Sequence, residues 1–361
     1  MLPMQLEWLG CAVGGGSVRA RRGTATMTGR ERVLAAMAGQ GTDHLGLMPI
    51  TMMLAADTLG VPYERYAREG RVMAAAQVKT AERYGFDHVS AIGPPGPESA
   101  DLGAAVRWYA DQPPAMAEAE ALLAEKNNLD ALLRRGAIAG ERVENRVKGL
   151  ARMRELVGGE LAVEGWLSGP CAAAAELRGL NRLMVDFHDD PEFVCGLLDF
   201  VLEVGIWFAG IQVDAGADLI GIGDAAASLV GPRIYRECVW PREKKLVEAI
   251  HACGAKARLH ICGNTRRILS EMSALGCDMV DIDFPVPMEE ARAKMGPDVT
   301  LSGNLDPVRE VRDGSPERLR GTLDELGKKA GPRWVVAAGC EIARGTPEEN
   351  LRVLAKFARS H

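Results

Sequence analysis

The sequence has no C-x-x-C pair, no excess of basic residues and no apolar run that reaches the length needed to cross a bilayer. Its eight cysteines are scattered through apolar segments, which is typical of reduced intracellular proteins and not of a disulfide framework. A net charge of −6 gives no basic surface for nucleic acid or for an acidic membrane. We therefore expect a cytoplasmic protein with neither a nucleic-acid nor a membrane partner.

The N-terminal region lacks the order of a secretory signal, because residues 1–26 place apolar residues ahead of a basic run that includes Arg19 and Arg22. Thr28 and Glu31 form the pattern of a helix capping box, which makes Met27 a more natural start. We expect residues 1–26 to be a disordered or wrongly assigned extension and residues 27–361 to form one domain. A barrel with insertions accommodates this length, and a hydrophobic content of 47% supports a large core.

Short apolar runs alternate with helical patterns along the rest of the chain. The expected strands are Leu45–Ile50, His88–Ile92, Leu161–Leu167, Asp218–Gly223, Lys256–Cys262, Met279–Phe284, Val299–Gly303 and Trp334–Ala338. The expected helices include Pro62–Arg83, Arg142–Val157, Pro191–Val213, Pro232–Ala252, Thr265–Leu275 and Pro316–Lys329. Apolar strands without alternation indicate a parallel sheet buried on both faces, and such a strand count closes a (β/α)8 TIM barrel.

An open doubly wound sheet is the alternative fold, although no G-x-G-x-x-G follows the first strand. Residues 94–140 do not fit a simple βα unit, since they carry proline clusters and a candidate hairpin around residues 105–110. We expect this region to be an insertion that caps the barrel mouth.

Three side chains that could bind a metal fall at the C-terminal ends of expected strands, where α/β barrels carry their active sites. Side chains two apart on a strand share a face, so His260 and Cys262 project together, and Cys340 follows the last strand. One imidazole and two thiolates suit Zn²⁺ and leave a fourth position open, the pattern of a catalytic zinc site. The alternative is that the cysteines are small buried hydrophobes, but their shared position at strand ends favours zinc.

Other polar residues at this edge each have two interpretations. Glu341 is a candidate fourth zinc ligand or a turn carboxylate. Asp224 and Glu164 are candidate catalytic residues, and Asp224 could orient a ligating histidine or simply hold a turn. Asn304 is a candidate cofactor-binding residue, although with Asp306 it also fits a turn and a helix cap.

Two further patterns predict supporting roles. Asp281 and Asp283 fit salt-bridge partners or groups that lie behind the metal ligands. The run Thr346-Pro-Glu-Glu349 predicts a helix that begins with a capping box.

Several motifs resemble the uroporphyrinogen decarboxylase superfamily: Leu259-His-Ile-Cys-Gly-Asn264, Ser302-Gly-Asn-Leu-Asp-Pro307 and Gly345-Thr-Pro-Glu-Glu-Asn350. The resemblance covers residues 28–360 and implies a distorted (β/α)8 barrel. Decarboxylases of the superfamily bind a tetrapyrrole with eight carboxylates and carry paired arginines after the first strand. Here that loop, Thr51–Ala56, has no arginine, and Cys340 stands where the decarboxylases have histidine. This branch therefore fits poorly.

The second branch of the superfamily comprises zinc methyltransferases that work with corrinoid proteins, such as methylcobamide:coenzyme M and chloromethane or methoxy-compound methyltransferases. Their His-x-Cys signature with a distant Cys matches His260, Cys262 and Cys340. The resemblance implies Zn²⁺ as cofactor and methyl transfer between methylcobalamin and a thiol or a methylated substrate. The chain has no D-x-H-x-x-G corrinoid-binding segment, so a separate corrinoid protein would be the partner.

Three functions remain in view. The first is this zinc methyltransferase, with the methyl donor or acceptor (coenzyme M, homocysteine, another thiol, a methoxy or halomethyl compound, or a folate route) left open. The second is a tetrapyrrole enzyme of the decarboxylase type. The third is a non-catalytic corrinoid-binding protein, in which the three ligands would not converge on one metal. An oligomer is compatible with each of them.

Overall fold

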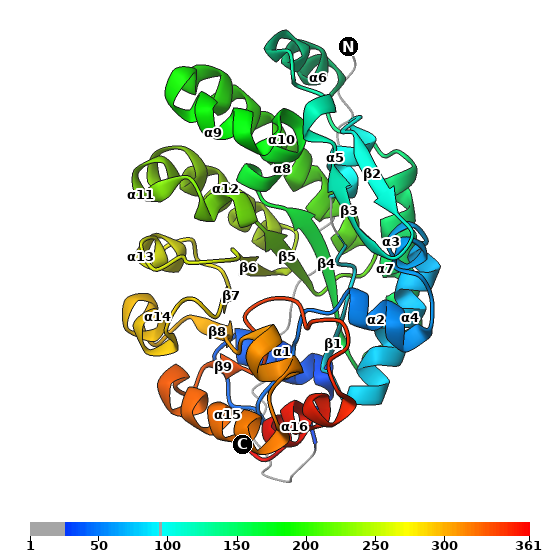
Figure 1. The fold of residues 1–361 in the computed structure, drawn as a ribbon, viewed down its shortest axis with the longest axis vertical. Helices are drawn as coiled ribbons and strands as arrows, with labels where there is room; N and C mark the ends of the chain where they lie inside the picture. Colours follow the sequence, from blue (N-terminus) through cyan, green and yellow to red (C-terminus); the bar gives the residue numbers. More distant parts are fainter. Residues whose placement is uncertain (1–25, 94–95) are drawn as a thin grey trace, which may run out of the picture.

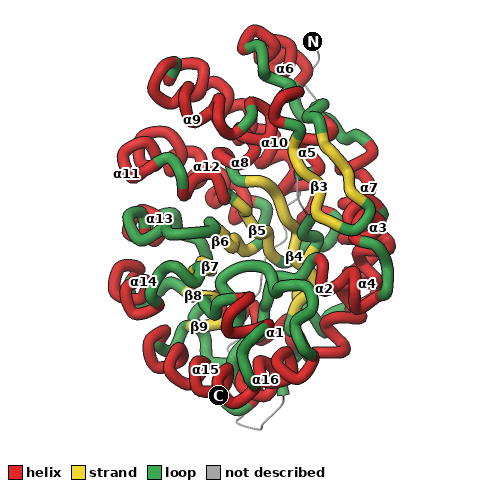
Figure 2. The backbone as a smooth tube through the Cα atoms, viewed as in Figure 1, coloured by secondary structure: helices red, strands yellow, loops and turns green. Residues whose placement is uncertain are grey.

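Seven parallel strands curl into a barrel with helices outside it in the computed structural model, which describes residues 26–93 and 96–361 (Figure 1, Figure 2). Their order in the sheet follows the chain, β1-β4-β5-β6-β7-β8-β9. The strands are β1 His88–Ser90, β4 Ala162–Ser168, β5 Leu219–Gly223, β6 Lys256–His260, β7 Met279–Ile282, β8 Thr300–Gly303 and β9 Trp334–Val335. The expected TIM-barrel class is confirmed. The doubly wound alternative is wrong, because in such a sheet the strand order reverses at a switch point, whereas here it follows the chain throughout.

Residues 45–50 close the gap between the first and last strands. Leu47 forms a parallel bridge with Val336, and its carbonyl accepts a hydrogen bond from the Asp87 N–H at 3.0 Å. The strand expected over these residues is reduced to this bridge. The Asp87 carboxylate, and not a neighbouring strand, accepts the Leu47 N–H at 2.8 Å, and Pro49 has no N–H to donate.

Helices surround the barrel. The helix expected over 62–83 divides in two at Glu69, whose backbone is extended. The helix expected over 232–252 contains a π-helical turn before Pro241, because proline has no N–H for the regular α-helical hydrogen bond. The helices of the barrel are α1 Gly29–Met37, α2 Met53–Leu59, α3 Tyr63–Arg68, α4 Gly70–Tyr84, α7 Glu141–Val157, α8 Pro170–Arg178, α9 Leu180–Asp189, α10 Pro191–Asp214, α11 Gly231–Ile234, η4 Tyr235–Val239, α12 Trp240–Ala252, α13 Leu269–Ser273, α14 Met288–Met295, η5 Pro307–Arg312, α15 Pro316–Ala330 and α16 Glu348–Arg359.

Two of the three expected helix caps are confirmed. Thr28 accepts the Glu31 N–H, and Glu31 accepts the Thr28 N–H in return, so the capping box starts α1. Asp306 accepts N–H groups of η5. The box expected at Thr346 is wrong, because its hydroxyl donates to the Ala343 carbonyl at 2.7 Å and Pro347 occupies the cap position of α16.

The helix α10 corrects the expectation that no segment is long and apolar enough to cross a membrane. By length and composition it meets both requirements, the one helix of the described residues that does. More than half of its most apolar stretch is buried inside the protein, as in the core helix of a large barrel.

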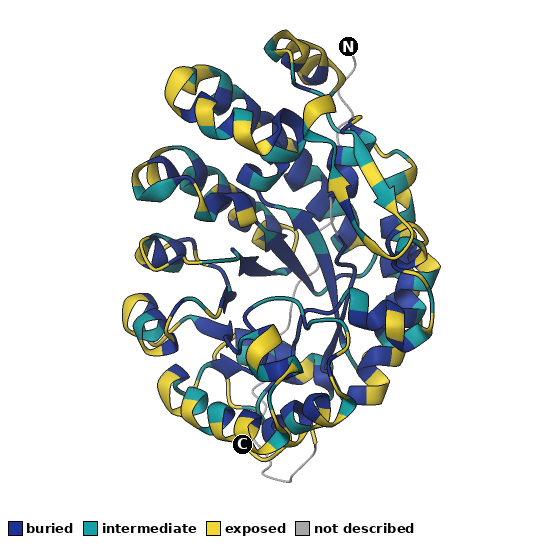
Figure 3. Ribbon diagram, in the orientation of Figure 1, coloured by how far each residue is buried: buried dark blue, intermediate teal, exposed yellow. Residues whose placement is uncertain are grey.

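The core fills the space between sheet and helices, and its buried residues line the strands and the inner helix faces (Figure 3). A smaller apolar cluster that includes Val33 and Met37 of α1 and Met48 fills the N-terminal end of the barrel. Gly29 packs against the backbone of Asp87, where a Cβ would come within 3.0 Å. Because α1 closes this end, the C-terminal end is where a cavity can form.

The insertion consists of α5 Pro97–Asp101, the hairpin β2 Val106–Tyr109 and β3 Gln112–Met116, two 3₁₀ turns, η1 Glu118–Glu120 and η2 Lys126–Asn128, and α6 Leu129–Arg135. The Asp111 carboxylate, in the turn of the hairpin, accepts the Tyr63 N–H at 3.1 Å and the Arg344 guanidinium at 3.0 Å. Arg344 lies in the loop after the last strand, so these contacts place the hairpin on the C-terminal side of the barrel.

Candidate metal centre

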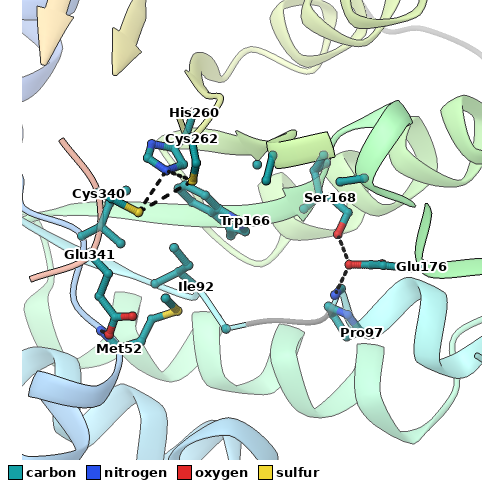
Figure 4. Close-up of a pocket in the computed structure, with 17 residues that line it drawn as sticks. Met52, Ile92, Pro97, Trp166, Ser168, Glu176, His260, Cys262, Cys340 and Glu341 are labelled. Atoms are coloured by element: carbon teal, nitrogen blue, oxygen red, sulfur yellow. Dashed lines mark hydrogen bonds between the residues drawn. The ribbon is translucent and has the colours of Figure 1, made fainter. Parts of the chain in front are cut away.

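Three side chains from two distant segments meet at the C-terminal end of the barrel. His260 ends β6, Cys262 follows two residues later, and Cys340 comes from the loop after β9. Their ligand atoms lie within 4.8 Å of one another (Figure 4). The Cys262 Sγ lies 2.9 Å from the His260 Nε2 and 3.7 Å from the Cys340 Sγ, which is 3.7 Å from the same Nε2.

This triangle fits a tetrahedral zinc ion. With Zn–S and Zn–N bonds of about 2.3 and 2.0 Å, two sulfurs lie about 3.8 Å apart and a sulfur lies about 3.5 Å from the nitrogen. The two distances that involve Cys340 match these values, whereas the 2.9 Å between Cys262 and His260 is a hydrogen-bond length. Those two groups would separate by roughly 0.6 Å to share an ion.

A chain of buried charges orients His260. Its Nδ1 lies 3.0 Å from the Asp281 Oδ2, as the register of β6 and β7 pairs these two residues directly. Both Asp281 oxygens accept from the Arg258 Nε at 3.0 Å, and Arg258 reaches Glu164 at 3.2 Å. An acceptor on Nδ1 fixes the ring and leaves Nε2 free to face the two thiols.

The same charges set the protonation of the three side chains. Burial lowers the pKa of His260, but the bonds to Asp281 and Cys340 outweigh burial and raise the pKa to about 10. The hydrogen bond from Cys262 lowers the pKa of Cys340 to about 4, against the effect of burial. Sharing that proton raises the pKa of Cys262 well above its ordinary value. Near neutral pH the Cys340 thiolate thus lies beside a protonated His260, which would release its proton on binding a metal ion.

Backbone packing holds the two cysteine loops together. The Asp283 carboxylate accepts the Gly263 N–H at 2.6 Å and the Phe284 N–H at 2.7 Å, which fixes the turn after Cys262. A Cβ on Gly339 would come 2.5 Å from the Phe284 nitrogen. Only glycine lets the loop that carries Cys340 pass this close.

Glu341 points away from the other three candidate ligands (Figure 4). Its Oε1 accepts the N–H groups of Met52 and Met53 at 3.1 and 2.7 Å, at the start of α2. Burial and the nearby Cys340 raise the pKa of Glu341 to about 7, against the lowering effect of the two backbone bonds. In this conformation Glu341 caps a helix, and its role as a fourth ligand stays a prediction.

The remaining predicted site residues, Glu164, Asp224 and Asn304, do not line the cavity at the barrel mouth. Glu164 is 1% exposed, contacts Arg258 and lies 3.7 Å from the His88 Nε2. Asp224 is fully buried and accepts the N–H groups of Cys171 and Ala172 at the start of α8. Its pKa rises to about 7, mainly because of burial.

Asn304 is also buried and donates its side-chain amide to the Val286 carbonyl. These contacts support structural roles for Asn304, Asp224 and Glu164. Their catalytic and cofactor-binding roles stay predictions.

The cavity at the barrel mouth has a volume of about 230 Å³ and an apolar wall. The metal-ligating cluster lies at one end, and Ser168 and Glu176 lie at the other (Figure 4). Trp166 lines the cavity beside His260, with ring centroids 6.2 Å apart. Its indole lies over β5, where a Cβ on Gly221 would come within 2.1 Å of the indole ring.

Several of these residues have no recognisable signal in the sequence. Arg258 and Glu98 are buried and Glu176 is partly buried, and the partners of all three come from other elements, so only the fold reveals their contacts. Trp166 had a weak signal, since it lies near the C-terminal end of a barrel strand, where active-site residues of such barrels are found. The glycines of β5 that make room for its ring can be matched to Trp166 only when the register of β4 and β5 is known.

The fold and this cluster define an α/β barrel enzyme scaffold with a candidate metal centre at its C-terminal mouth. The chain belongs to the uroporphyrinogen decarboxylase family, which it matches over residues 28–361.

Both expected branches are found among its relatives. The methylcobamide:CoM methyltransferase MtbA of Methanosarcina mazei is 31% identical over 222 residues, 61% of this chain and 64% of that protein. A uroporphyrinogen decarboxylase of Prochlorococcus marinus is 30% identical over 220 residues, 58% of this chain and 62% of that protein. The matches span less than two thirds of each relative.

A solved structure described as a methyltransferase from Methanosarcina mazei has the same fold. It superimposes with a TM-score of 0.79 over 92% of this chain and 98% of its own length, at 23% sequence identity. The likeness therefore extends over the whole barrel.

Proposed function

We propose that the protein is a zinc-dependent methyltransferase that moves a methyl group between a corrinoid protein and a thiol or methylated substrate. The observation that carries the proposal is the convergence of His260, Cys262 and Cys340 at one end of an apolar cavity. An N/S₂ donor set with one open position is typical of catalytic and not of structural zinc. The free state of all cysteines in the described residues, 26–93 and 96–361, suits a cytoplasmic enzyme.

The residues of the chain would prepare the thiol for reaction. His260, Cys262 and Cys340 would hold Zn²⁺, which supplies the Lewis acidity that lowers the pKa of a thiol in the open position. Asp281 keeps the His260 ring in place. In the net transfer the sulfur gains the methyl group, the thiol proton leaves to solvent, and the electron pair of the carbon–cobalt bond stays on cobalt.

A separate corrinoid protein would deliver or accept the methyl group at the barrel mouth. The hairpin of the insertion lies on that side, fixed there by the bonds of Asp111 to Tyr63 and Arg344. MtbA is by name a methylcobamide:CoM methyltransferase, which supports a partner and substrate of this kind.

The decarboxylase alternative is disfavoured by the charge of the cavity. A tetrapyrrole with eight carboxylates needs several cationic partners. Of the described residues that line the cavity, none is arginine or lysine, whereas two are glutamates, Glu176 and Glu341. The non-catalytic alternative predicted that the ligands would not converge, and the 4.8 Å cluster argues against it.

Metal analysis with activity measurements tests the proposal. We expect about one zinc per chain in the wild type, and loss of that zinc in His260→Ala, Cys262→Ser and Cys340→Ser. Methyl transfer from methylcobalamin to 2-mercaptoethanol should fall by roughly 100-fold or more in each, in the range that the loss of a metal ligand or its support produces. Cys253→Ser is the matched control, because Cys253 is an exposed free thiol far from the cluster in the fold. A zinc-free wild type, or variants that keep their zinc, would contradict the proposal.

A further inference from the structure

The end of the cavity opposite the metal cluster is built around two carboxyl groups. Glu176 of α8 lines the cavity, and its Oε1 accepts the Ser168 hydroxyl at 3.0 Å and the Gly96 N–H at 3.2 Å (Figure 4). Glu98 of α5 lies behind Ser168, whose N–H donates to the Glu98 Oε1 at 2.8 Å. Both glutamates thus contact Ser168, at the end of β4.

Each carboxyl group has one oxygen without a partner. The Oε2 atoms of Glu98 and Glu176 are buried and accept no hydrogen bond from any described residue. Glu98 is only 3% exposed. Burial and repulsion from Glu176 raise the pKa of Glu98 to about 8, and burial raises the pKa of Glu176. Glu176 lines the cavity, and none of the described lining residues is a cation, so a positively charged donor from a ligand would be well placed beside it.

No cation of the described residues shares this end of the cavity wall. The nearest buried cation is Arg146 of α7, which donates to the carbonyls of Ala91 and Gly93. It does not line the cavity, and it offsets only part of the rise in the pKa of Glu98. Because Glu98 holds its proton near neutral pH, Glu176 carries the negative charge at the distal end of the cavity, whereas the middle, which includes Ile92 and Trp166, is apolar.

We propose that the substrate of this cavity is a small thiol, or its methylated form, that carries an amino group bound by Glu176 with Glu98 behind it. This inference rests on the proposed function, since it assigns the sulfur or methyl group to the metal-ligating end. An ammonium group has three donors and a positive charge, which suits a carboxylate on a cavity wall that carries no cation among its described residues. A sulfonate or a carboxylate at the same position would meet two glutamates and no cation, so an anionic thiol such as coenzyme M fits this cavity poorly.

Three thiols that differ in one terminal group test the proposal: 2-mercaptoethylamine, 2-mercaptoethanol and 2-mercaptoethanesulfonate. Their binding to the zinc-loaded protein is measured by calorimetry, in wild type and in Glu176→Gln. The three thiols differ in acidity, but each thiol has the same acidity with both proteins. For each thiol, the ratio of its affinities for wild type and for Glu176→Gln therefore reports only the effect of the terminal group.

We expect Glu176→Gln to reduce the affinity for 2-mercaptoethylamine by about 10-fold to 100-fold, the range for a hydrogen bond to a charged group. The affinity for 2-mercaptoethanol should change by less than about 3-fold, and that for the sulfonate should rise. Glu98→Gln should act in the same direction, more weakly, and it serves as the second variant if Glu176→Gln does not fold. Glu203→Gln, on the exposed face of α10, is the control.

Equal changes for all three thiols would overturn the proposal, as would a wild type that binds the sulfonate more tightly than the amine. Failure of the proposed function looks different. In that case the wild type lacks zinc or binds none of the thiols, including 2-mercaptoethanol, whatever residue stands at position 176.

Discussion

At the scale of single residues, the candidate centre depends on one histidine that is held from behind. Asp281 contacts the Nδ1 of His260, and Arg258 and Glu164 extend the contact into the fully buried interior of the barrel. Opposing effects act on Asp281: burial raises its pKa, and the attraction of Arg258 and His260 outweighs burial and lowers it to about 2. The carboxylate is therefore ionised and available to accept from the ring.

Asp281→Asn should weaken zinc binding by about 10-fold to 100-fold, because a neutral amide orients the imidazole less firmly and makes it less basic. Competition with a chromophoric chelator measures the change. Asp278→Asn is a matched control, since Asp278 also contacts a histidine, His251, at 2.7 Å, but at the surface. Equal zinc affinity in wild type and Asp281→Asn would show that this contact does not support the ligand.

At the scale of elements, the Glu341 carboxylate connects the loop after β9, the last strand, to the start of α2. Glu341 follows Cys340 and accepts two N–H groups at the start of α2. A helix N-terminus has unpaired N–H groups and a partial positive charge, so a carboxylate there stabilises the helix. This contact and zinc ligation compete for the same side chain.

Glu341→Ala distinguishes the two roles. If Glu341 is a helix cap, the variant should lose about 1 kcal/mol of unfolding free energy, and it should keep its zinc. Urea denaturation and metal content of the same samples provide the two measurements. Glu349→Ala, an exposed glutamate in the first turn of α16, is the control. Loss of zinc from Glu341→Ala would instead establish the predicted fourth ligand.

Elements with a strong local pattern could be predicted, and those that depend on a partner could not. The apolar runs that became β4, β5 and β6 were evident from sequence, and the C-terminal end of β6 identified His260 and Cys262 as candidates. Residues 45–50 have the same apolar pattern, but the Asp87 side chain takes the place of a strand neighbour. Glu98 and Glu176 lie on helices where a glutamate is usually exposed, so their burial follows only from packing.

At the scale of the whole molecule, the barrel brings the two ends of the cavity together from most of the chain. The metal cluster comes from β6 and the loop after β9, and the acidic pair comes from α5 and α8. Asp224 connects the two regions, because it follows β5 and fixes the start of α8. The two ends of the cavity therefore come together only when the whole barrel has closed.

The acidic pair also predicts how stability depends on pH. Because burial and Glu176 raise the pKa of Glu98 to about 8, the folded protein holds a proton that the unfolded chain releases near pH 4.5. The stabilisation is fully present below the unfolded pKa and is lost as pH rises through the folded pKa. Arg146 and the more distant Asp224 are the charged groups that face the pair, and Arg146 limits the shift in the pKa of Glu98.

The free energy of unfolding of the zinc-loaded wild type should therefore fall between pH 5.5 and pH 9 relative to that of Glu98→Gln. Each unit of pKa shift corresponds to about 1.4 kcal/mol, so we expect a relative loss of at least about 1 kcal/mol. Zinc binding depends on pH in both proteins, and comparing the two removes this contribution. Urea denaturation at several pH values measures the difference, with Glu203→Gln as control. Parallel curves for wild type and Glu98→Gln would mean that Glu98 is ionised throughout, and that the distal end of the cavity is already charged at low pH.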